Sequence, residues 1–115
     1  MKSLSNKELC IFYLKKYAKK DINGVAALFD DTIVLRDWKI SVVGKDEALK
    51  ETQKNFNNVD SITIEVLSMY ESSNTIVAEL KITIDKKEEL YVVDVISFNS
   101  SSKIVSIRAY LGRGD

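Results

Sequence analysis

The clearest structural signal in the chain is "VDVISFNSSSKIVSIRAYLG", residues 93–112. Two runs of β-branched and aromatic residues surround "NSSS", a composition typical of a turn, so we predict strands over residues 88–98 and 103–111. A connection this short joins antiparallel strands. The first strand carries Asp94 inside "YVVDVISF", a run that predicts a strand covered on both faces. Because an ionised carboxylate would lose hydration there, we expect Asp94 to be protonated or paired.

The strand pattern extends toward the N-terminus from this segment. Residues 61–71 and 75–85 have strand composition, and the short polar segments "SSN" and "KK" separate the consecutive runs. The second half of the chain therefore predicts an antiparallel meander. Polar and apolar residues alternate over residues 79–84, which predicts one solvated and one buried face for that strand.

Helical patterns fill most of the first half of the chain. Ser5 and Glu8 have the spacing of a capping box, and apolar residues then recur at helical intervals, which predicts a helix over residues 6–19. A shorter helix is expected over residues 22–29, and a third over residues 45–56.

Between the second and third helices, "DDTIVLRDWKISVVG", residues 30–44, predicts a strand, a turn and a short return strand. Three N-terminal helices followed by a long, curved, mainly antiparallel sheet indicate one α+β domain over residues 1–115. In that architecture the helices cover one face of the sheet. Long strands wrapped over helices leave a cavity at the open end of the wrap, where apolar ligands are usually held.

Composition excludes several classes of function. The chain has 17 basic and 17 acidic residues, so no net charge favours nucleic acid or a membrane surface as a partner. It has no His, which excludes Ser–His and Cys–His catalysis and His-ligated metals, and its single Cys10 predicts a small buried hydrophobe. No acidic cluster suggests a metal, so we expect no metal and no cofactor.

The apolar run at residues 9–14 is too short to span a membrane, and we expect a cytoplasmic protein.

Three stretches carry a resemblance to a known family: "DINGVAALFDD" (residues 21–31), "RDW" (residues 36–38) and residues 93–112. The chain resembles the nuclear transport factor 2-like superfamily. Within it, the chain is most similar to the SnoaL-like polyketide cyclases and the steroid Δ5-3-ketoisomerases. The resemblance implies a cone-shaped α+β fold around a small-molecule pocket.

The resemblance also implies roles for three side chains, by their positions relative to the second helix and to the "FN" that follows the strand over residues 88–98. Asp37 corresponds to the general base, and Tyr13 and Asp94 to the two donors that stabilise an enolate oxygen. The implied activity is that of a cofactor-independent isomerase, or a polyketide cyclase-like lyase, that moves a proton alpha to the carbonyl of a small apolar ketone. Trp38 stands where the isomerases have a Pro after the base.

Each catalytic assignment has a structural alternative. Tyr13 can be a packed core residue on the apolar stripe of its helix, Asp37 can form the turn after its strand, and Asp94 can bond to a buried Tyr. Eight further residues are expected to line the pocket: Tyr17, Trp38, Phe56, Ile82, Ile96, Phe98, Ala109 and Leu111.

Two other functions remain open. The same cavity can serve a non-catalytic binding protein for a hydrophobic small molecule, or the fold can serve as a dimeric interaction module. Tyr91, Val93 and Val95 project opposite Asp94, and apolar residues on an exposed sheet face suggest a dimer contact. We therefore expect a homodimer formed through the outer face of the sheet, together with any of the three functions.

Overall fold

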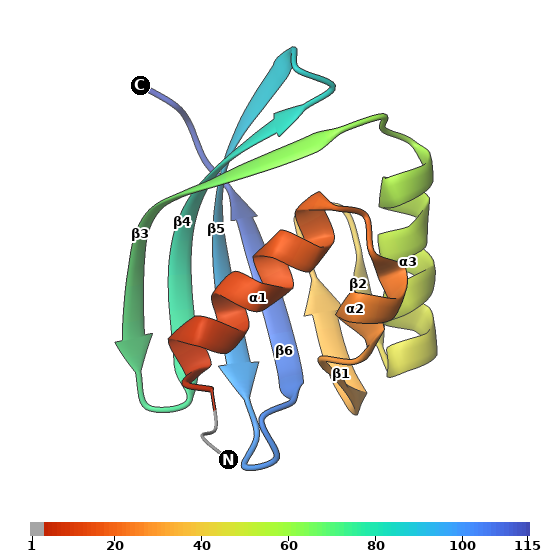
Figure 1. Ribbon diagram of the computed structural model, residues 1–115, viewed down its shortest axis with the longest axis vertical. Coiled ribbons are helices and arrows are strands. Elements are labelled where there is room, and N and C mark those ends of the chain that lie inside the picture. The colour runs from red at the N-terminus through yellow and green to blue at the C-terminus, as the bar shows by residue number, and fades with distance from the viewer. Residues whose placement is uncertain (1–3) are drawn as a thin grey trace.

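A computed structural model describes residues 4–115. This part of the chain forms three helices packed on one curved six-stranded sheet (Figure 1). The expected α+β class is therefore confirmed. The elements in chain order are α1 (Asn6–Ala18), α2 (Ile22–Ala26), β1 (Phe29–Arg36), β2 (Ser41–Val43), α3 (Lys45–Asn57), β3 (Ile62–Ser72), β4 (Thr75–Ile84), β5 (Glu88–Phe98) and β6 (Ile104–Leu111).

The strand order in the sheet is β2-β1-β6-β5-β4-β3. Strands β3 to β6 form the expected antiparallel meander, and β1 pairs with β2 as the expected strand and return strand. The pairing of β1 with β6 is parallel, with Leu35 opposite Ile107 and Arg36 opposite Arg108. This parallel pair joins the two halves of the sheet and brings the end of β1 close to the middle of β5.

The helices lie where the sequence indicates, with one difference in length. The hydroxyl of Ser5 accepts a hydrogen bond from the backbone N–H of Glu8, and the Glu8 carboxylate accepts one from the N–H of Ser5, so the predicted capping box begins α1. Helix α2 ends at Ala26, three residues before the predicted end. Phe29 instead begins β1, because its backbone pairs with Ile104 of β6.

Figure 1 shows α1 lying across the strands of the second half, with α3 beside β1 and β2. Both helices cover the same face of the sheet, and the core fills the space between. Cys10 is completely buried there, as expected from its apolar neighbours. Burial raises the pKa of its thiol to about 12, so the thiol stays protonated and is a weak nucleophile.

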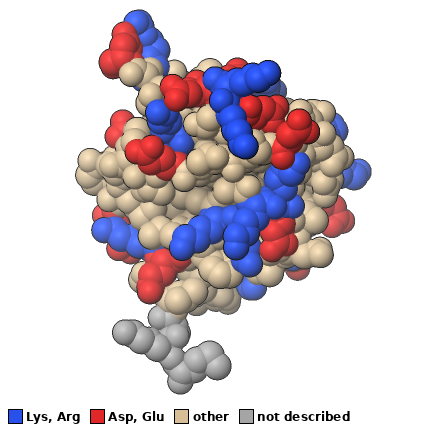
Figure 2. All heavy atoms as spheres, turned by 45° about the horizontal axis from the view of Figure 1, so that its top comes forward, with Lys and Arg blue, Asp and Glu red and all other residues tan. Residues whose placement is uncertain are grey.

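None of the helices in residues 4–115 combines the length and apolar composition needed to cross a membrane. On the face shown in Figure 2, acidic and basic side chains are interspersed around an uncharged central area. This mixture agrees with the balanced composition, since no single sign of charge covers the view.

Candidate functional site

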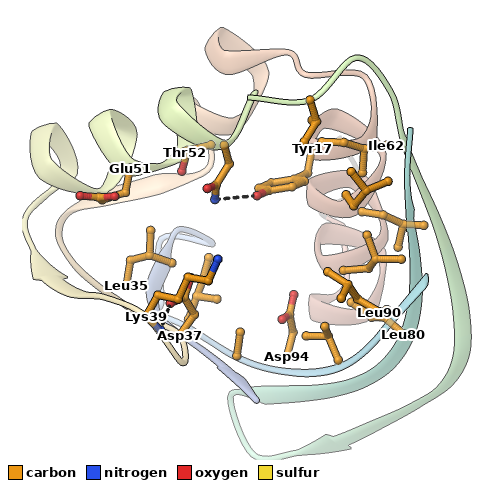
Figure 3. A pocket seen from close by; sticks show the side chains of 18 of the residues that line it. Tyr17, Leu35, Asp37, Lys39, Glu51, Thr52, Ile62, Leu80, Leu90 and Asp94 are labelled. Atoms are coloured by element: carbon orange, nitrogen blue, oxygen red, sulfur yellow. Dashed lines mark hydrogen bonds between the residues drawn. The ribbon is translucent and has the colours of Figure 1, made fainter. Parts of the chain in front are cut away.

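A cavity of about 480 Å³ lies between α1, α3 and the inner face of the sheet (Figure 3). Its size falls within the range of pockets that hold small organic molecules. Most of its wall is apolar, formed by Leu14, Leu35, Ile40, Val59, Ile62, Ile64, Leu80, Ile82, Ile84, Leu90, Val92, Ile107 and Ala109. Eleven polar side chains also line it: Tyr13, Tyr17, Asp37, Lys39, Glu51, Thr52, Lys54, Asn55, Asn58, Glu88 and Asp94.

Asp94 lies in the middle of β5, on the strand face that lines the cavity. Its neighbours across the sheet are Ala78 of β4 and Ala109 of β6. Because both neighbours are small, space remains above the carboxyl group. Asp94 is 8% exposed, and its side chain makes no hydrogen bond or ion pair with any other residue in the described part of the chain.

Burial raises the pKa of Asp94 from its ordinary value of 3.8 to about 7, and the negative charge of Asp37 acts in the same direction. Protonated and ionised forms therefore coexist near neutral pH. A protonated Asp94 offers an O–H donor to the cavity, and the cavity is where an acceptor on a ligand would lie.

Tyr13 extends from α1 and is buried beside the cavity. Burial is the main reason that the pKa of its phenol lies well above the ordinary value, and nearby Asp94 raises it further. The phenol therefore stays neutral and can act as a donor. Its hydroxyl bonds to no other residue within 4–115, although the ring packs against Tyr17 and Phe29, at centroid distances of 6.0 and 6.2 Å.

Asp37 follows β1 in the turn that leads to β2, and it also lines the cavity. Its Oδ1 accepts hydrogen bonds from the backbone N–H groups of Lys39 at 2.7 Å and Ile40 at 2.9 Å. Its own N–H donates to the Ile40 carbonyl at 2.9 Å. Asp37 thus forms the turn, as one alternative predicts. Its Oδ2 has no hydrogen-bond partner among the described residues, so this oxygen remains available for chemistry.

Tyr17 and Asn55 provide a second polar position in the cavity (Figure 3). The side-chain amide of Asn55 on α3 donates a hydrogen bond of 3.2 Å to the hydroxyl of Tyr17 on α1. Asn55 was not among the site residues predicted from the sequence. A usable signal was present, because Asn55 follows Thr52 by three residues and precedes Phe56 in the predicted third helix, and residues three apart are neighbours on a helix surface.

Four of the eight expected pocket residues line the cavity: Tyr17, Trp38, Ile82 and Ala109. Trp38 is 44% exposed and contributes to the rim. The three residues with expected catalytic roles, Tyr13, Asp37 and Asp94, all line the same cavity.

The other four expected pocket residues lie outside the cavity lining. Phe56 is buried, and its ring packs edge-on against Tyr17 at a centroid distance of 4.9 Å, so it supports the wall from behind. Ile96 and Phe98 share the face of Asp94 but lie farther along β5, where the core covers them. Leu111 ends β6 and is 48% exposed.

Within residues 4–115, no group of three or more Asp, Glu or Cys side chains is arranged to hold a metal ion. Four carboxyl groups line the cavity, those of Asp37, Glu51, Glu88 and Asp94, together with the phenols of Tyr13 and Tyr17; the site proposed below uses Asp37, Asp94, Tyr13 and Tyr17. These four side chains supply groups that can accept or donate a proton toward a bound molecule.

Comparison with solved structures finds the same fold in several proteins. An NTF2-like protein from Cytophaga hutchinsonii is 10% identical, with a TM-score of 0.81 over 96% of this chain and 93% of that chain. A candidate ketosteroid isomerase from Kribbella flavida is 12% identical, with a TM-score of 0.82 over 96% of this chain and 79% of that chain. A candidate SnoaL-like polyketide cyclase from Shewanella denitrificans is 12% identical, with a TM-score of 0.79 over 93% of this chain and 90% of that chain.

At these identities the likeness concerns the fold alone. A search of curated proteins finds no match. The model of the SnoaL-like domain family matches residues 12–107, a range that contains Tyr13, Asp37 and Asp94. The match spans most of the chain, from α1 to the middle of β6, and on this ground the chain belongs to the SnoaL-like domain family.

Proposed function

We propose that this protein is a cofactor-independent enzyme that moves a proton alpha to the carbonyl of a small apolar ketone, as an isomerase or a cyclase. The observation that carries the proposal is Asp94, a carboxyl group with a raised pKa that faces an apolar cavity and has no partner among the described residues. Buried carboxyl groups normally have partners, so an unpartnered one beside a cavity suggests a functional role.

The proposed reaction on a β,γ-unsaturated ketone has two proton transfers. Asp37 Oδ2 takes the proton from the carbon alpha to the carbonyl, and the C–H electron pair forms the enolate double bond while the carbonyl π pair moves to oxygen. Tyr13 and protonated Asp94 donate hydrogen bonds to that oxygen and stabilise its charge. Asp37 then returns the proton to the gamma carbon, which gives the conjugated enone.

The test is an ultraviolet assay of enone formation on a panel of β,γ-unsaturated ketones with one to four rings. We expect turnover of at least one ketone, and Asp37→Asn should lower kcat by about 10²-fold to 10⁴-fold, the usual contribution of a general base. Asp31→Asn is the matched control, because Asp31 is exposed on β1 and lies outside the cavity lining. Turnover that survives Asp37→Asn would contradict the proposed base.

A second candidate function is a receptor that binds the same ligands without turnover. The observation that favours it is the pair of backbone N–H groups on Asp37 Oδ1, since these bonds already give Asp37 a structural role in the turn. Calorimetric binding of a panel ketone with no enone formation would support the receptor. Absence of both binding and turnover would leave the interaction module as the function.

We also propose that the outer face of the sheet forms a homodimer, whichever function the cavity serves. Three exposed apolar residues support this dimer: Val43 of β2, Tyr70 of β3 and Tyr110 of β6. The helices and the core already cover the other face of the sheet. The buried Nε of Arg108 also supports it, because it has no hydrogen-bond partner in the described part of the chain. Light scattering of the purified protein should give twice the mass of one chain, and a monomer at micromolar concentration would refute the dimer.

A further inference from the structure

The hydroxyl of Tyr17 has an unused hydrogen-bond donor. Its oxygen accepts the bond from the Asn55 amide at 3.2 Å, and no described residue accepts a bond from its O–H. A phenol carries one donor as well as acceptor capacity, so the O–H remains available. In Figure 3 the phenol of Tyr17 points into the cavity, and a dashed line marks the hydrogen bond at its oxygen. The free donor therefore faces the space that a ligand would occupy.

This donor lies on a different wall from Asp94. Tyr17 and Asn55 come from α1 and α3, whereas Asp94 comes from the sheet, and Figure 3 shows the two positions on opposing sides of the cavity. Apolar side chains, including Leu80 and Leu90, form the wall beside them. Asp94 and the Tyr17–Asn55 pair thus present polar groups from opposing sides of the cavity, with apolar side chains among those that line the wall beside them.

Packing fixes the ring of Tyr17 independently of the Asn55 bond. The ring lies edge-on against Phe56 at 4.9 Å, with 72° between the planes, and it also contacts Tyr13. The amide of Asn55 is therefore not needed to hold the ring in place. Its remaining effect is to occupy the acceptor side of the hydroxyl, which directs the O–H away from Asn55 and toward the cavity.

We propose that Tyr17 and Asn55 form a second ligand-binding position, and that the preferred ligands carry two oxygen functions at separate points of one apolar skeleton. One oxygen binds at Tyr13 and Asp94, and the second accepts the hydrogen bond from Tyr17. This inference rests on the function proposed above and specifies its substrate class as diketones or hydroxyketones, in preference to monoketones. A monoketone of the same size makes one hydrogen bond fewer, because none of its atoms accepts a bond from the Tyr17 hydroxyl, and this lowers its affinity.

The test compares probes with one and two oxygens. 2-Naphthol mimics an enolate oxygen on an apolar skeleton, and 2,6- and 2,7-dihydroxynaphthalene add a second oxygen at two different separations. Their binding is measured by fluorescence titration at pH 6, where Asp94 is mostly protonated. We expect Tyr17→Phe to weaken at least one dihydroxynaphthalene about tenfold and 2-naphthol less than twofold, since about 1.4 kcal/mol is a typical hydrogen bond.

Matched controls exist for both residues. Tyr70→Phe removes a phenol hydroxyl from β3 but keeps the apolar ring that the proposed dimer uses, and Asn57→Ala removes an amide from α3. Neither residue lines the cavity. Both controls should bind all probes as the wild type does. Asn55→Ala should weaken the dihydroxynaphthalene selectively, by less than Tyr17→Phe does, because the phenol donor remains but its direction is no longer fixed.

Three results would overturn the inference. Equal weakening of all probes by Tyr17→Phe would show that Tyr17 contacts the same oxygen as Asp94, or acts only through packing. No weakening of any probe, or no binding of any probe to the wild type, would show that the second position does not bind an oxygen. The proposed function is tested by a different assay. Ketone turnover requires proton transfer by Asp37, whereas naphthol binding does not, so either claim can fail without the other.

Discussion

Asp94→Asn should make the stability of this protein less sensitive to pH. The folded state raises the pKa of Asp94 from 3.8 to about 7, chiefly by burial. Between these two values the unfolded chain has lost the proton and the folded chain keeps it, so the wild type loses stability as pH rises through that window. Asn cannot ionise, and the variant is therefore spared this loss.

The magnitude follows from the shift. Each pH unit inside the window changes the contribution of Asp94 by about 1.4 kcal/mol, because one pKa unit corresponds to that free energy. From pH 5 to pH 7 the free energy of unfolding of Asp94→Asn, minus that of the wild type, should therefore rise by roughly 2 kcal/mol, because Asp94 in the folded state is already half ionised near pH 7. Above about pH 7 the difference levels off, because Asp94 is ionised in both the folded and unfolded states.

The assay is urea unfolding followed by circular dichroism at pH 5, 6, 7 and 8.5, for the wild type, Asp94→Asn and the exposed control Asp31→Asn. Taking the difference between proteins at each pH cancels the contributions of titrating groups that do not interact with Asp94. The control should show no comparable rise. A difference between Asp94→Asn and the wild type that stays constant with pH would refute the buried, protonated carboxyl group on which the proposed function rests.

Three further outcomes are expected. Asp37→Asn should move the midpoint of the pH profile of 2-naphthol binding to lower pH, because the charge of Asp37 helps to raise the pKa of Asp94; an upward move would contradict the electrostatic link. Phe56→Ala should lower the free energy of unfolding by about 3–5 kcal/mol in urea titrations, since Phe56 is buried against Tyr17, and a loss below about 1 kcal/mol would argue against that packing. Ser5→Ala should lower the same quantity by about 1 kcal/mol through loss of the cap on α1, and an unchanged midpoint in thermal unfolding would show that the cap contributes nothing.

Local pattern in the sequence was sufficient to predict the elements and the faces of the strands. The hydrophobic runs and turn compositions predicted the four-strand meander closely, and the capping box located the start of α1. The position of Asp94 within an apolar run predicted its burial. These features depend on residues a few positions apart, which interact in any conformation that contains the element.

The length of α2 and the pairing of β1 were decided by contacts distant in sequence. Phe29 fits a helical pattern, yet pairing with Ile104 draws it into β1. The parallel pairing of β1 with β6 then brings Asp37 to the cavity wall that Asp94 also lines. No local pattern near residue 37 contains this information.

Alternation along each strand establishes which residues share a face, whereas long-range packing selects the part of that face that is covered. Ile82, Ile96 and Phe98 all have the right alternation to point inward, but Ile96 and Phe98 are buried in the core, whereas Ile82 lines the cavity. Likewise, Asn55 meets Tyr17 only because α3 packs near α1. The difference arises because alternation sets only the direction in which a side chain points. Which part of the inner face stays uncovered depends on how the shorter helices cross the longer strands.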